Sequence, residues 1–496
     1  MSSSSPFVIA RAPMKARVSQ SPTANGWKGP SGDPRMCRSG ALLRLFAVAV
    51  LLVCGCTPRS PDPEPPPVGT AAKDPGPRAD VQAAGAALAG LSAVELEAFE
   101  IGKADFVEAE AVPDGLGPTM NLDSCAGCHL QPAIGGSSPP LNPQVAFANQ
   151  LGATNGVPAF ITPNGPVREV RFVKGADGKA DGGVHSLFTI AGRSDAPGCA
   201  LPQENFGAEA AKGNLIFRIP TPVFGSGLIE QIPDSEIAKN LASDRAMKKE
   251  YGIAGKPNIV MAFHTISGQP NKNGNDGTFG RFGWKAQNKS LLIFSAEAYN
   301  VEMGITSEAF PSERDETAGC QFIETPNSVT TLDAQSVPEG LSSIEKFAFF
   351  MRFLAAPAPS SEAPGGAPSI QRGKGQFGNV GCALCHTPSL QTGNSNVVAL
   401  RNQTVALYSD LLLHDMGSGL ADGISQGQAS PSEFRTAPLW GLGQRLFFLH
   451  DGRTADLRAA INAHSSRGSE ANAVIQNYYR LPETDKQDLF NFLRSL

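Results

Sequence analysis

Cys125-Ala126-Gly127-Cys128-His129 is one of two Cys-x-x-Cys-His patterns in this 496-residue chain, and Cys382-Ala383-Leu384-Cys385-His386 is the other. This spacing is the attachment signature of c-type haem: both cysteines form thioethers to the haem, and the histidine is the proximal ligand of the iron. Half of a zinc site and a thioredoxin-like redox pair are the alternatives. Each pattern carries its own histidine, however, and no partner group at zinc-finger spacing follows. The sequence therefore predicts two covalently attached haem c groups.

The chain shows an internal duplication around these two patterns. Gly102-Lys103-Ala104-Asp105-Phe106 precedes the first pattern and Gly373-Lys374-Gly375-Gln376-Phe377 precedes the second. A second pair of similar segments reads FRIPTPVFG at residues 217–225 and FRTAPLWG at residues 434–441. Each half is therefore expected to form one haem domain. The predicted fold class is mainly α, with two cytochrome c-like helical haem domains, the first enlarged by long loops and short strands.

Local signals place helices at both ends of the predicted body. Ser92-Ala93-Val94-Glu95 is a capping-box pattern that predicts the start of a helix, and Pro482 can begin a C-terminal amphipathic helix. Residues 355–368 are rich in Ala, Pro, Ser and Gly, which is typical of a boundary between domains. We therefore expect an N-terminal haem domain with insertions over residues 86–360 and a C-terminal cytochrome c-like haem domain over residues 361–496.

The N-terminus is typical of an exported bacterial lipoprotein. Arg38 and Arg44 flank the apolar residues 41–53, which are too few for a membrane-spanning helix, and Cys56 would be the lipidated residue. A simple cleaved signal and an uncleaved anchor are the alternatives. We expect an export signal over residues 1–56, a Pro-rich extended tether over residues 57–85, and a periplasmic body anchored to a bacterial membrane.

Charge and cysteine usage agree with this compartment. Residues 1–56 contain seven basic residues and one acidic residue, which leaves 34 basic and 45 acidic residues and a net charge of −11 for the remainder. This charge disfavours nucleic acid and suits a small, basic electron-carrier protein, although a solvated acidic surface without a partner has the same composition. Of the nine cysteines, Cys37 and Cys54 lie in the signal region, and Cys199 and Cys320 remain after haem attachment and lipidation. In an oxidising compartment we expect these two to pair as a disulfide.

The second axial ligand of the C-terminal haem decides its chemistry. Thr454-Ala455-Asp456 predicts the cap of a helix that brings His464 onto the same face as Leu457 and Ile461. A histidine at such a position is usually a core residue, but beside a haem it is a credible iron ligand. The candidates are His414, Met416, His450 and His464.

Five further segments resemble motifs of one family. They read NLDS (residues 121–124), RFGWKA (281–286), EAYNVEMG (297–304), SDLLLHDMG (409–417) and LHDGR (449–453). By these motifs and their order, the chain from about residue 90 onward resembles the bacterial di-haem cytochrome c peroxidase superfamily. It is most similar to the di-haem oxidoreductase branch, some of whose members are labelled thiol oxidoreductases.

The resemblance implies roles for three residues. Glu302 matches the glutamate of an Asn-Pro-x-Glu-Met motif that moves a proton between the peroxide oxygens, with Val301 in place of the proline. Trp284 resembles the tryptophan that lies between the two haems and helps an electron to cross. His464 aligns with the sixth ligand of the second haem, which is usually methionine. Bis-histidine ligation would lower the potential of this haem, while His450 is expected to lie next to the ligands rather than among them.

The first half departs from the family pattern. The peroxidases carry a distal histidine shortly after the first haem motif, but here the next histidines are His185 and His264. We therefore expect a first haem with an open distal site. Phe294 lies where a catalytic glutamine is usual, and the Trp-Asp-Gly-Arg motif is altered at residues 284–287.

Three functions follow as hypotheses. The first is a periplasmic di-haem enzyme that reduces hydrogen peroxide at the N-terminal haem with Glu302, taking electrons from a c-type cytochrome or a cupredoxin through the C-terminal haem. The second is an oxygenase or protein-modifying oxidase that uses peroxide or dioxygen, for which an apolar pocket beside the first haem would be the sign. The third is a pure electron-transfer cytochrome. The resemblance leaves open whether a calcium ion lies between the domains, as in related peroxidases.

Overall fold

A computed structural model describes residues 71–80, 82–118, 120, 122–178, 193–260, 265–266, 269–270, 278–312, 317, 319–362 and 365–496. The expected export signal and the first part of the expected tether lie outside these residues. Within the part of the chain that is described, none of the helices combines the length and apolar character that a membrane span requires. Residues 67–496 form one unit by their internal contacts, and a domain boundary near residue 360 stays a prediction.

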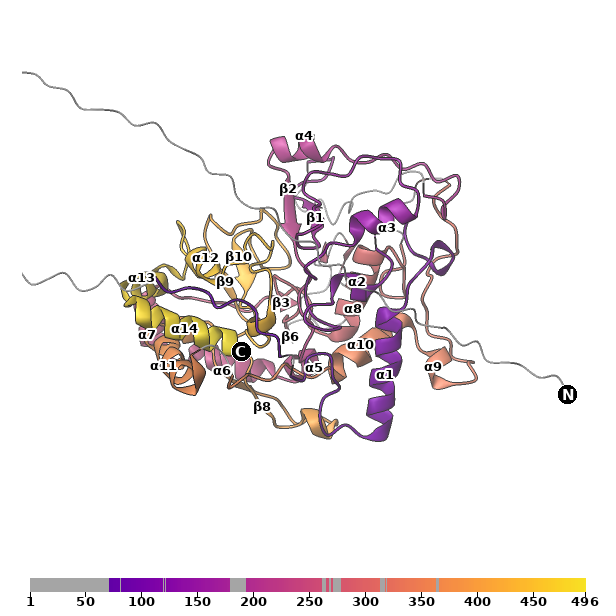
Figure 1. Ribbon diagram of the computed structural model, residues 1–496. Helices are drawn as coiled ribbons and strands as arrows, with labels where there is room; N and C mark the ends of the chain where they lie inside the picture. Colours follow the sequence, from indigo (N-terminus) through magenta and orange to yellow (C-terminus); the bar gives the residue numbers. More distant parts are fainter. Residues whose placement is uncertain are drawn as a thin grey trace, which may run out of the picture. The chain divides into compact units, whose positions relative to one another are not determined.

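The described fold is mainly α-helical, as the sequence predicted, and its strands are short (Figure 1). The helices before residue 360 are α1 (Ala93–Val107), α2 (Cys125–Cys128), α3 (Gln144–Gln150), α4 (Phe206–Ala211), α5 (Ser226–Glu230), α6 (Asp234–Ala242), α7 (Arg245–Tyr251), α8 (Leu291–Met303), α9 (Val337–Gly340) and α10 (Ser343–Phe353). Those after it are α11 (Gly366–Asn379), α12 (Leu457–Asn462), α13 (Asn472–Arg480) and α14 (Glu483–Ser495). Single 3-10 turns occur at Val112–Asp114, Cys382–Leu384, Val398–Leu400 and Leu442–Gln444.

The strands pair into two-stranded antiparallel sheets. The pairs are β1 (Glu169–Phe172) with β2 (Leu215–Arg218), β3 (Ile259–Val260) with β6 (Thr278–Phe279), β4 (Thr265–Ile266) with β5 (Gln269–Pro270), β7 (Leu390–Gln391) with β8 (Thr404–Val405), and β9 (Leu413–Asp415) with β10 (Glu433–Arg435). Strands β2 and β10 lead into the two similar segments at residues 217–225 and 434–441. These sheets are too small to form a layer, so helix packing dominates the core.

Helix α1 begins at the predicted capping box and crosses α10 at a glycine. Ser92 Oγ accepts a hydrogen bond from the Glu95 amide, and the Glu95 carboxylate accepts one from the Ser92 amide. A Cβ atom on Gly102 would lie 2.1 Å from the Lys346 carbonyl oxygen of α10, so the two backbones meet at this point. Phe106, one turn later, packs against Phe350 with ring centroids 4.7 Å apart.

The second half repeats this arrangement with α11 and α14. A Cβ atom on Gly373 would lie 1.9 Å from the Asp488 carbonyl oxygen of α14. Phe377 then packs against Phe492 with ring centroids 5.4 Å apart. The duplicated glycine and phenylalanine thus occupy equivalent places in two helix pairs, α1 with α10 and α11 with α14 (Figure 1). The glycine permits close helix contact, and the phenylalanine fills the adjacent core.

The described part of the expected tether is not extended away from the body. Asp74 forms a buried ion pair with Arg494 of α14, with Oδ2 and Nη2 2.7 Å apart, and the Ala72 amide donates to the Glu483 carboxylate. Arg78 donates to the carbonyl oxygen of Leu496. This corrects the expectation of a free tether up to residue 85, because specific charge pairs dock residues 72–80 onto the C-terminal helix.

Two long-range links join segments far apart in the sequence. Cys199 and Cys320 form a disulfide with Cα atoms 4.5 Å apart, as predicted. Asp422 is buried between two cations: its carboxylate lies 2.6 Å from Arg218 Nη2 and 3.1 Å from Lys285 Nζ. Because Arg218 ends β2 and Asp422 follows β9, this cluster connects the two halves of the chain.

Candidate functional site

The first Cys-x-x-Cys-His pattern forms the short helix α2, with His129 at its C-terminal cap. His129 is buried, and its Nδ1 atom lies 3.0 Å from the Gly136 carbonyl oxygen. When Nδ1 donates its proton to this carbonyl, the lone pair of Nε2 is free. This is the arrangement in which a histidine binds a metal. Phe106 meets the His129 ring edge-on with centroids 6.0 Å apart. The duplicated phenylalanine therefore orients the predicted iron ligand.

The second pattern has the same geometry on a 3-10 turn, Cys382–Leu384, instead of an α-helical turn. His386 Nδ1 lies 3.0 Å from the Tyr408 carbonyl oxygen, and Phe377 lies 6.4 Å from the His386 ring centroid. All four cysteines of the two patterns are free thiols, and burial raises the pKa of Cys382 to about 12. A pair of free thiols beside a histidine with an available Nε2 fits covalent haem attachment in each half.

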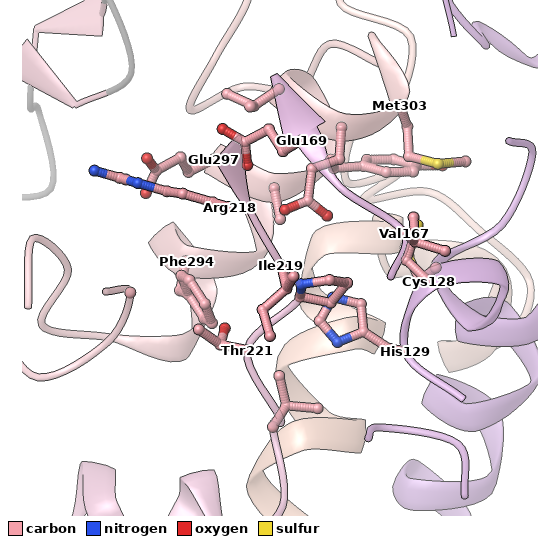
Figure 2. A pocket seen from close by; sticks show the side chains of 18 of the residues that line it. Cys128, His129, Val167, Glu169, Arg218, Ile219, Thr221, Phe294, Glu297 and Met303 are labelled. Carbon is pink, nitrogen blue, oxygen red and sulfur yellow. The ribbon is translucent and has the colours of Figure 1, made fainter. Parts of the chain in front are cut away.

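The first cavity, of about 140 Å³, lies above His129. Much of its lining is apolar, including Phe106, Phe294 and Phe347, and His129 is its one described histidine. Figure 2 shows Glu169, Glu297 and Arg218 on one side of this cavity and His129 toward the other. The cavity thus combines an apolar wall, which suits a ring system, with a group of ionisable side chains.

Glu302 lines the first cavity from the last turn of α8. The helix begins where Ser290 Oγ accepts from the Ile293 amide, and it ends at Gly304, whose left-handed φ of 75° suits glycine. A Cβ atom on Gly304 would lie 2.8 Å from Gly117 Cα, so this turn is fixed against a neighbouring segment. Burial, together with the charges of Glu169 and Glu297, raises the pKa of Glu302 to about 8. At neutral pH Glu302 therefore carries a proton that it can donate.

The second cavity, of about 220 Å³, contains both His386 and His464 in its lining. Asp456 caps α12 as predicted, its side chain accepting from the Ala459 amide, and His464 follows the end of this helix. His464 Nδ1 lies 2.8 Å from the Ala460 carbonyl oxygen, which again leaves Nε2 available. Burial lowers the pKa of both histidines, to about 4 for His386, so both are neutral and able to bind a metal.

His414 is held by two carboxylates. Its Nε2 atom lies 2.9 Å from Asp410, and its Nδ1 atom lies 2.7 Å from Glu470. Although burial opposes the charge, Asp410 raises the pKa of His414 well above its ordinary value. A protonated histidine with both nitrogens engaged has no lone pair for iron, which disfavours this alternative. Met416 also lines the second cavity, so it remains the other candidate beside His464.

Trp284 lines both cavities. Its Nε1 atom donates to the Ile219 carbonyl oxygen at 3.0 Å, and its own carbonyl accepts from the Arg435 amide at 2.9 Å. The Trp284 ring meets His450 edge-on, while His450 stacks on Phe434 with centroids 4.3 Å apart. The structure thus fixes Trp284 between the two predicted cofactor positions, and His450 packs beside it.

Several residues that line the two cavities were not predicted from the sequence. Glu169 lies on β1 within the insertion, where no motif marks it. Glu297 stands five residues before Glu302 in the same motif, a spacing that does not put two residues on one face of a helix, so the helical repeat of α8 did not mark it. In the second cavity the unmarked residues are Arg435 and Arg445.

The described residues do not test two expectations from the sequence, the candidate distal histidines and the calcium ion. His185 and His264, the candidate distal histidines, are not among the described residues. Within the described ranges, no three or more His, Cys, Asp and Glu side chains gather into a group that could hold a metal ion. The calcium ion thus stays an open expectation.

Several solved structures are similar to parts of this chain, among them a hydrazine synthase chain and a MauG-like protein, whereas no curated protein sequence matches it. A hydrazine synthase chain from Kuenenia stuttgartiensis, pressurised with 20 bar xenon, has 19% identity and a TM-score of 0.21 over 32% of this chain. The aligned part spans 56% of that chain, little more than half of its length. A MauG-like protein associated with microbial copper homeostasis has 16% identity and a TM-score of 0.25, over 56% of this chain and 91% of its own.

A family model shows where the chain belongs. The model described as "Di-haem oxidoreductase, putative peroxidase" matches residues 170–496. This range includes Trp284, Glu302, the second Cys-x-x-Cys-His pattern and His464, while the first pattern precedes it. Haem is accordingly the cofactor, and the protein is an oxidoreductase enzyme: the chain belongs to the di-haem oxidoreductase family.

Proposed function

We propose that this protein is an exported enzyme that reduces hydrogen peroxide beside His129, with electrons relayed through the second half. The haem, bound covalently through Cys125 and Cys128, would supply an iron that binds peroxide and passes electrons to it. Peroxide takes up two electrons and two protons and leaves as two waters, so its reduction needs a proton at the leaving oxygen. The observation that carries the proposal is the position of Glu302, a carboxyl with a pKa of about 8 in the same cavity as His129.

Glu302 holds the proton that this reaction needs. Its carboxyl is neutral at pH 7 because burial and two neighbouring carboxylates disfavour its charge. After one proton has been donated, Glu169 is placed to help replace it, because its side chain is 20% exposed to solvent and lines the same cavity. Apolar side chains line much of the rest of the cavity and lower the polarity around the proton transfer.

Electron relay is proposed for Trp284 and the second cavity. Cys382 and Cys385 would attach the second haem, His386 and His464 would hold its iron through Nε2, and Trp284 bridges the space toward the first cavity. A small, basic cytochrome or cupredoxin is the proposed electron donor, because the body carries a large negative charge. A lipid anchor at Cys56 would keep the enzyme at the periplasmic face of a membrane.

The Glu302→Gln variant tests the proposed site. Glutamine has nearly the same shape but no acidic proton, so steady-state peroxide turnover should fall by roughly 10²–10⁴-fold while both haems stay attached. Glu250→Gln, at an exposed position on α7, is the matched control and should turn over peroxide at the wild-type rate. Equal rates for the Glu302 variant and the wild type would remove Glu302 from the mechanism and contradict the proposal.

An oxidase that modifies an organic or protein substrate is the second candidate. The aromatic wall formed by Phe294 and Phe347 in the first cavity favours it. Such an enzyme consumes peroxide only when the second substrate is oxidised. Peroxide reduction at full rate with a cytochrome donor alone would therefore exclude this candidate, and peroxide consumption that requires an organic co-substrate would support it.

A further inference from the structure

Arg435 is a buried cation at the edge of the second cavity. It is 9% exposed, and its Nε atom donates to the Gly283 carbonyl oxygen at 3.0 Å. Nη1 makes one long contact of 3.4 Å with the Thr436 carbonyl oxygen. Both of these acceptors are neutral, so neither compensates the positive charge of the guanidinium group.

Arg445 is a second cation in the same lining. Both arginines border the second cavity and also a small cavity of about 30 Å³ next to Trp284, and neither borders the first cavity. Burial lowers the pKa of each arginine to about 10, and each is further lowered by a neighbouring cation, Arg445 for Arg435 and Arg494 for Arg445. No carboxylate of the described residues forms an ion pair with Arg435 or Arg445.

The other buried arginines of the described residues form ion pairs with carboxylates, unlike the buried Arg435 and the half-buried Arg445. Arg218 pairs with Asp422 at 2.6 Å, Arg281 pairs with Asp234, and Arg494 pairs with Asp74 at 2.7 Å. An unpaired buried charge is strongly destabilising, and proteins compensate it with a counter-charge. Two uncompensated guanidinium groups beside one cavity therefore call for an anion with two negative charges, or two anionic groups, inside that cavity.

We propose that Arg435 and Arg445 bind the two propionate carboxylates of the haem in the second cavity. The proposal rests on the proposed covalent haem at Cys382 and Cys385. Haem carries two carboxylates on one edge of its ring, and guanidinium groups bind carboxylates with strong, oriented hydrogen bonds. The ring would then lie between His386 and His464 with its carboxylate edge toward Arg435, on the side where Trp284 lies.

This placement has a consequence for electron transfer. Bis-histidine ligation lowers the reduction potential of a haem, while positive charges beside the ring favour the reduced, less positive iron. The two arginines would therefore give the second haem a higher reduction potential than that of a bis-histidine haem without arginines beside it. They would also fix the propionates next to Trp284, on the path toward the first cavity.

The test measures the potential of each haem by spectroelectrochemistry in the fully loaded protein. Arg435→Gln and Arg445→Gln should each move the potential of the low-spin second haem to a lower value and leave the first haem unchanged. Arg445→Lys, which keeps the charge, should retain most of the wild-type potential. Arg480→Gln, at an exposed position at the end of α13 in the same half, is the matched control and should not change either potential.

The possible outcomes separate this inference from the proposed function. Loaded variants whose second-haem potential matches the wild type would overturn the propionate site, whatever the rate of peroxide turnover. A haem-loaded wild-type protein that does not turn over peroxide would instead overturn the proposed function. Its haem potentials could still be compared with those of the variants. A wild-type potential that shifts on adding acetate or phosphate would show a site open to free anions, which also overturns the proposal.

One further measurement covers variants that fail to load haem. Resonance Raman spectra of the wild type and Arg445→Lys report the propionate bending modes directly, and hydrogen bonding to a guanidinium shifts these modes. The proposal expects a different mode for the second haem in the lysine variant. Identical spectra would contradict it.

Discussion

The carboxyl group of Glu302 shows how one residue gains its chemistry from its surroundings. A solvated glutamate has a pKa of about 4.3 and is fully charged at neutral pH. In the first cavity, loss of water and the charges of Glu169 and Glu297 raise the pKa of Glu302 to about 8. The side chain is therefore an acid at the pH where a surface glutamate is a base.

The pH dependence of turnover follows from this value. Only the protonated form of Glu302 can donate, so peroxide turnover should be constant below the pKa and fall as pH rises through about 8. In Glu302→Gln the residual turnover should lose this alkaline limb, because no group at this position titrates. A pH–rate profile of both proteins checks this, and an unchanged alkaline limb in the variant would assign that ionisation to another residue.

Among single residues, the sequence predicted those that belong to a recognisable motif. It missed those whose role depends on the side chains packed around them in the fold. The two Cys-x-x-Cys-His patterns and Glu302 each have a spacing that indicates chemistry. Glu169 reaches the first cavity from an insertion, and Arg435 and Arg445 are notable only because no carboxylate pairs with them. The lack of a partner is a property of three-dimensional packing, so no local pattern could have revealed it.

Among the elements, the crossing of α11 and α14 depends on one glycine. In Gly373→Ala the new methyl group would meet the Asp488 carbonyl oxygen at 1.9 Å and Phe492 Cβ at 2.7 Å, so the helices must separate. We expect this substitution to lower the free energy of unfolding by at least ~1–3 kcal/mol, the usual cost of overpacking a core. Chemical denaturation of the loaded protein measures it.

Gly375 provides the control on the same helix. A Cβ atom there would meet nothing within 4 Å, so Gly375→Ala gains only helix propensity. It should raise the free energy of unfolding by ~0.5–1 kcal/mol. If both alanine variants had the same stability, the close helix contact would not explain why the glycine recurs before each pattern.

The sequence predicted elements where a local signal marks their ends. The capping box placed the start of α1, Pro482 preceded α14, and Asp456 capped α12. Helix α10, the partner of α1, was not predicted. The docking of residues 72–80 was also missed, because a Pro-rich segment is extended by itself and becomes fixed only through charges on α14.

For the molecule as a whole, the duplication explains how two cofactor positions come to lie next to one another. The similar segments at residues 217–225 and 434–441 meet directly: a Cβ atom on Gly225 would lie 2.6 Å from the Trp440 ring. Trp284 is held between Ile219 of one segment and Arg435 of the other. The two halves thus contact each other through the repeated segment, with the tryptophan at the contact.

The buried cluster around Asp422 holds this contact together by charge. Asp422 is 1% exposed and lies within 3.1 Å of both Arg218 and Lys285. Burial alone would raise the pKa of Asp422, but the two cations bring it below its ordinary value. Asp422→Asn would leave two cations buried without a counter-charge, so we expect a loss of ~3–5 kcal/mol in the free energy of unfolding.

The loss of stability caused by Asp422→Asn should be smaller in acid than near neutral pH. A carboxyl with a lowered pKa contributes its full stability above the unfolded value of about 3.9, and this contribution is lost as pH falls through the folded value. The difference between wild type and Asp422→Asn should therefore be greatest near pH 6, where Lys285, with its pKa of about 8, is still charged, and should shrink in acid. Asp333→Asn, at an exposed position, should show no difference at either pH. A stability difference that does not change between neutral and acid pH would mean that packing, and not charge, connects the two halves at Asp422.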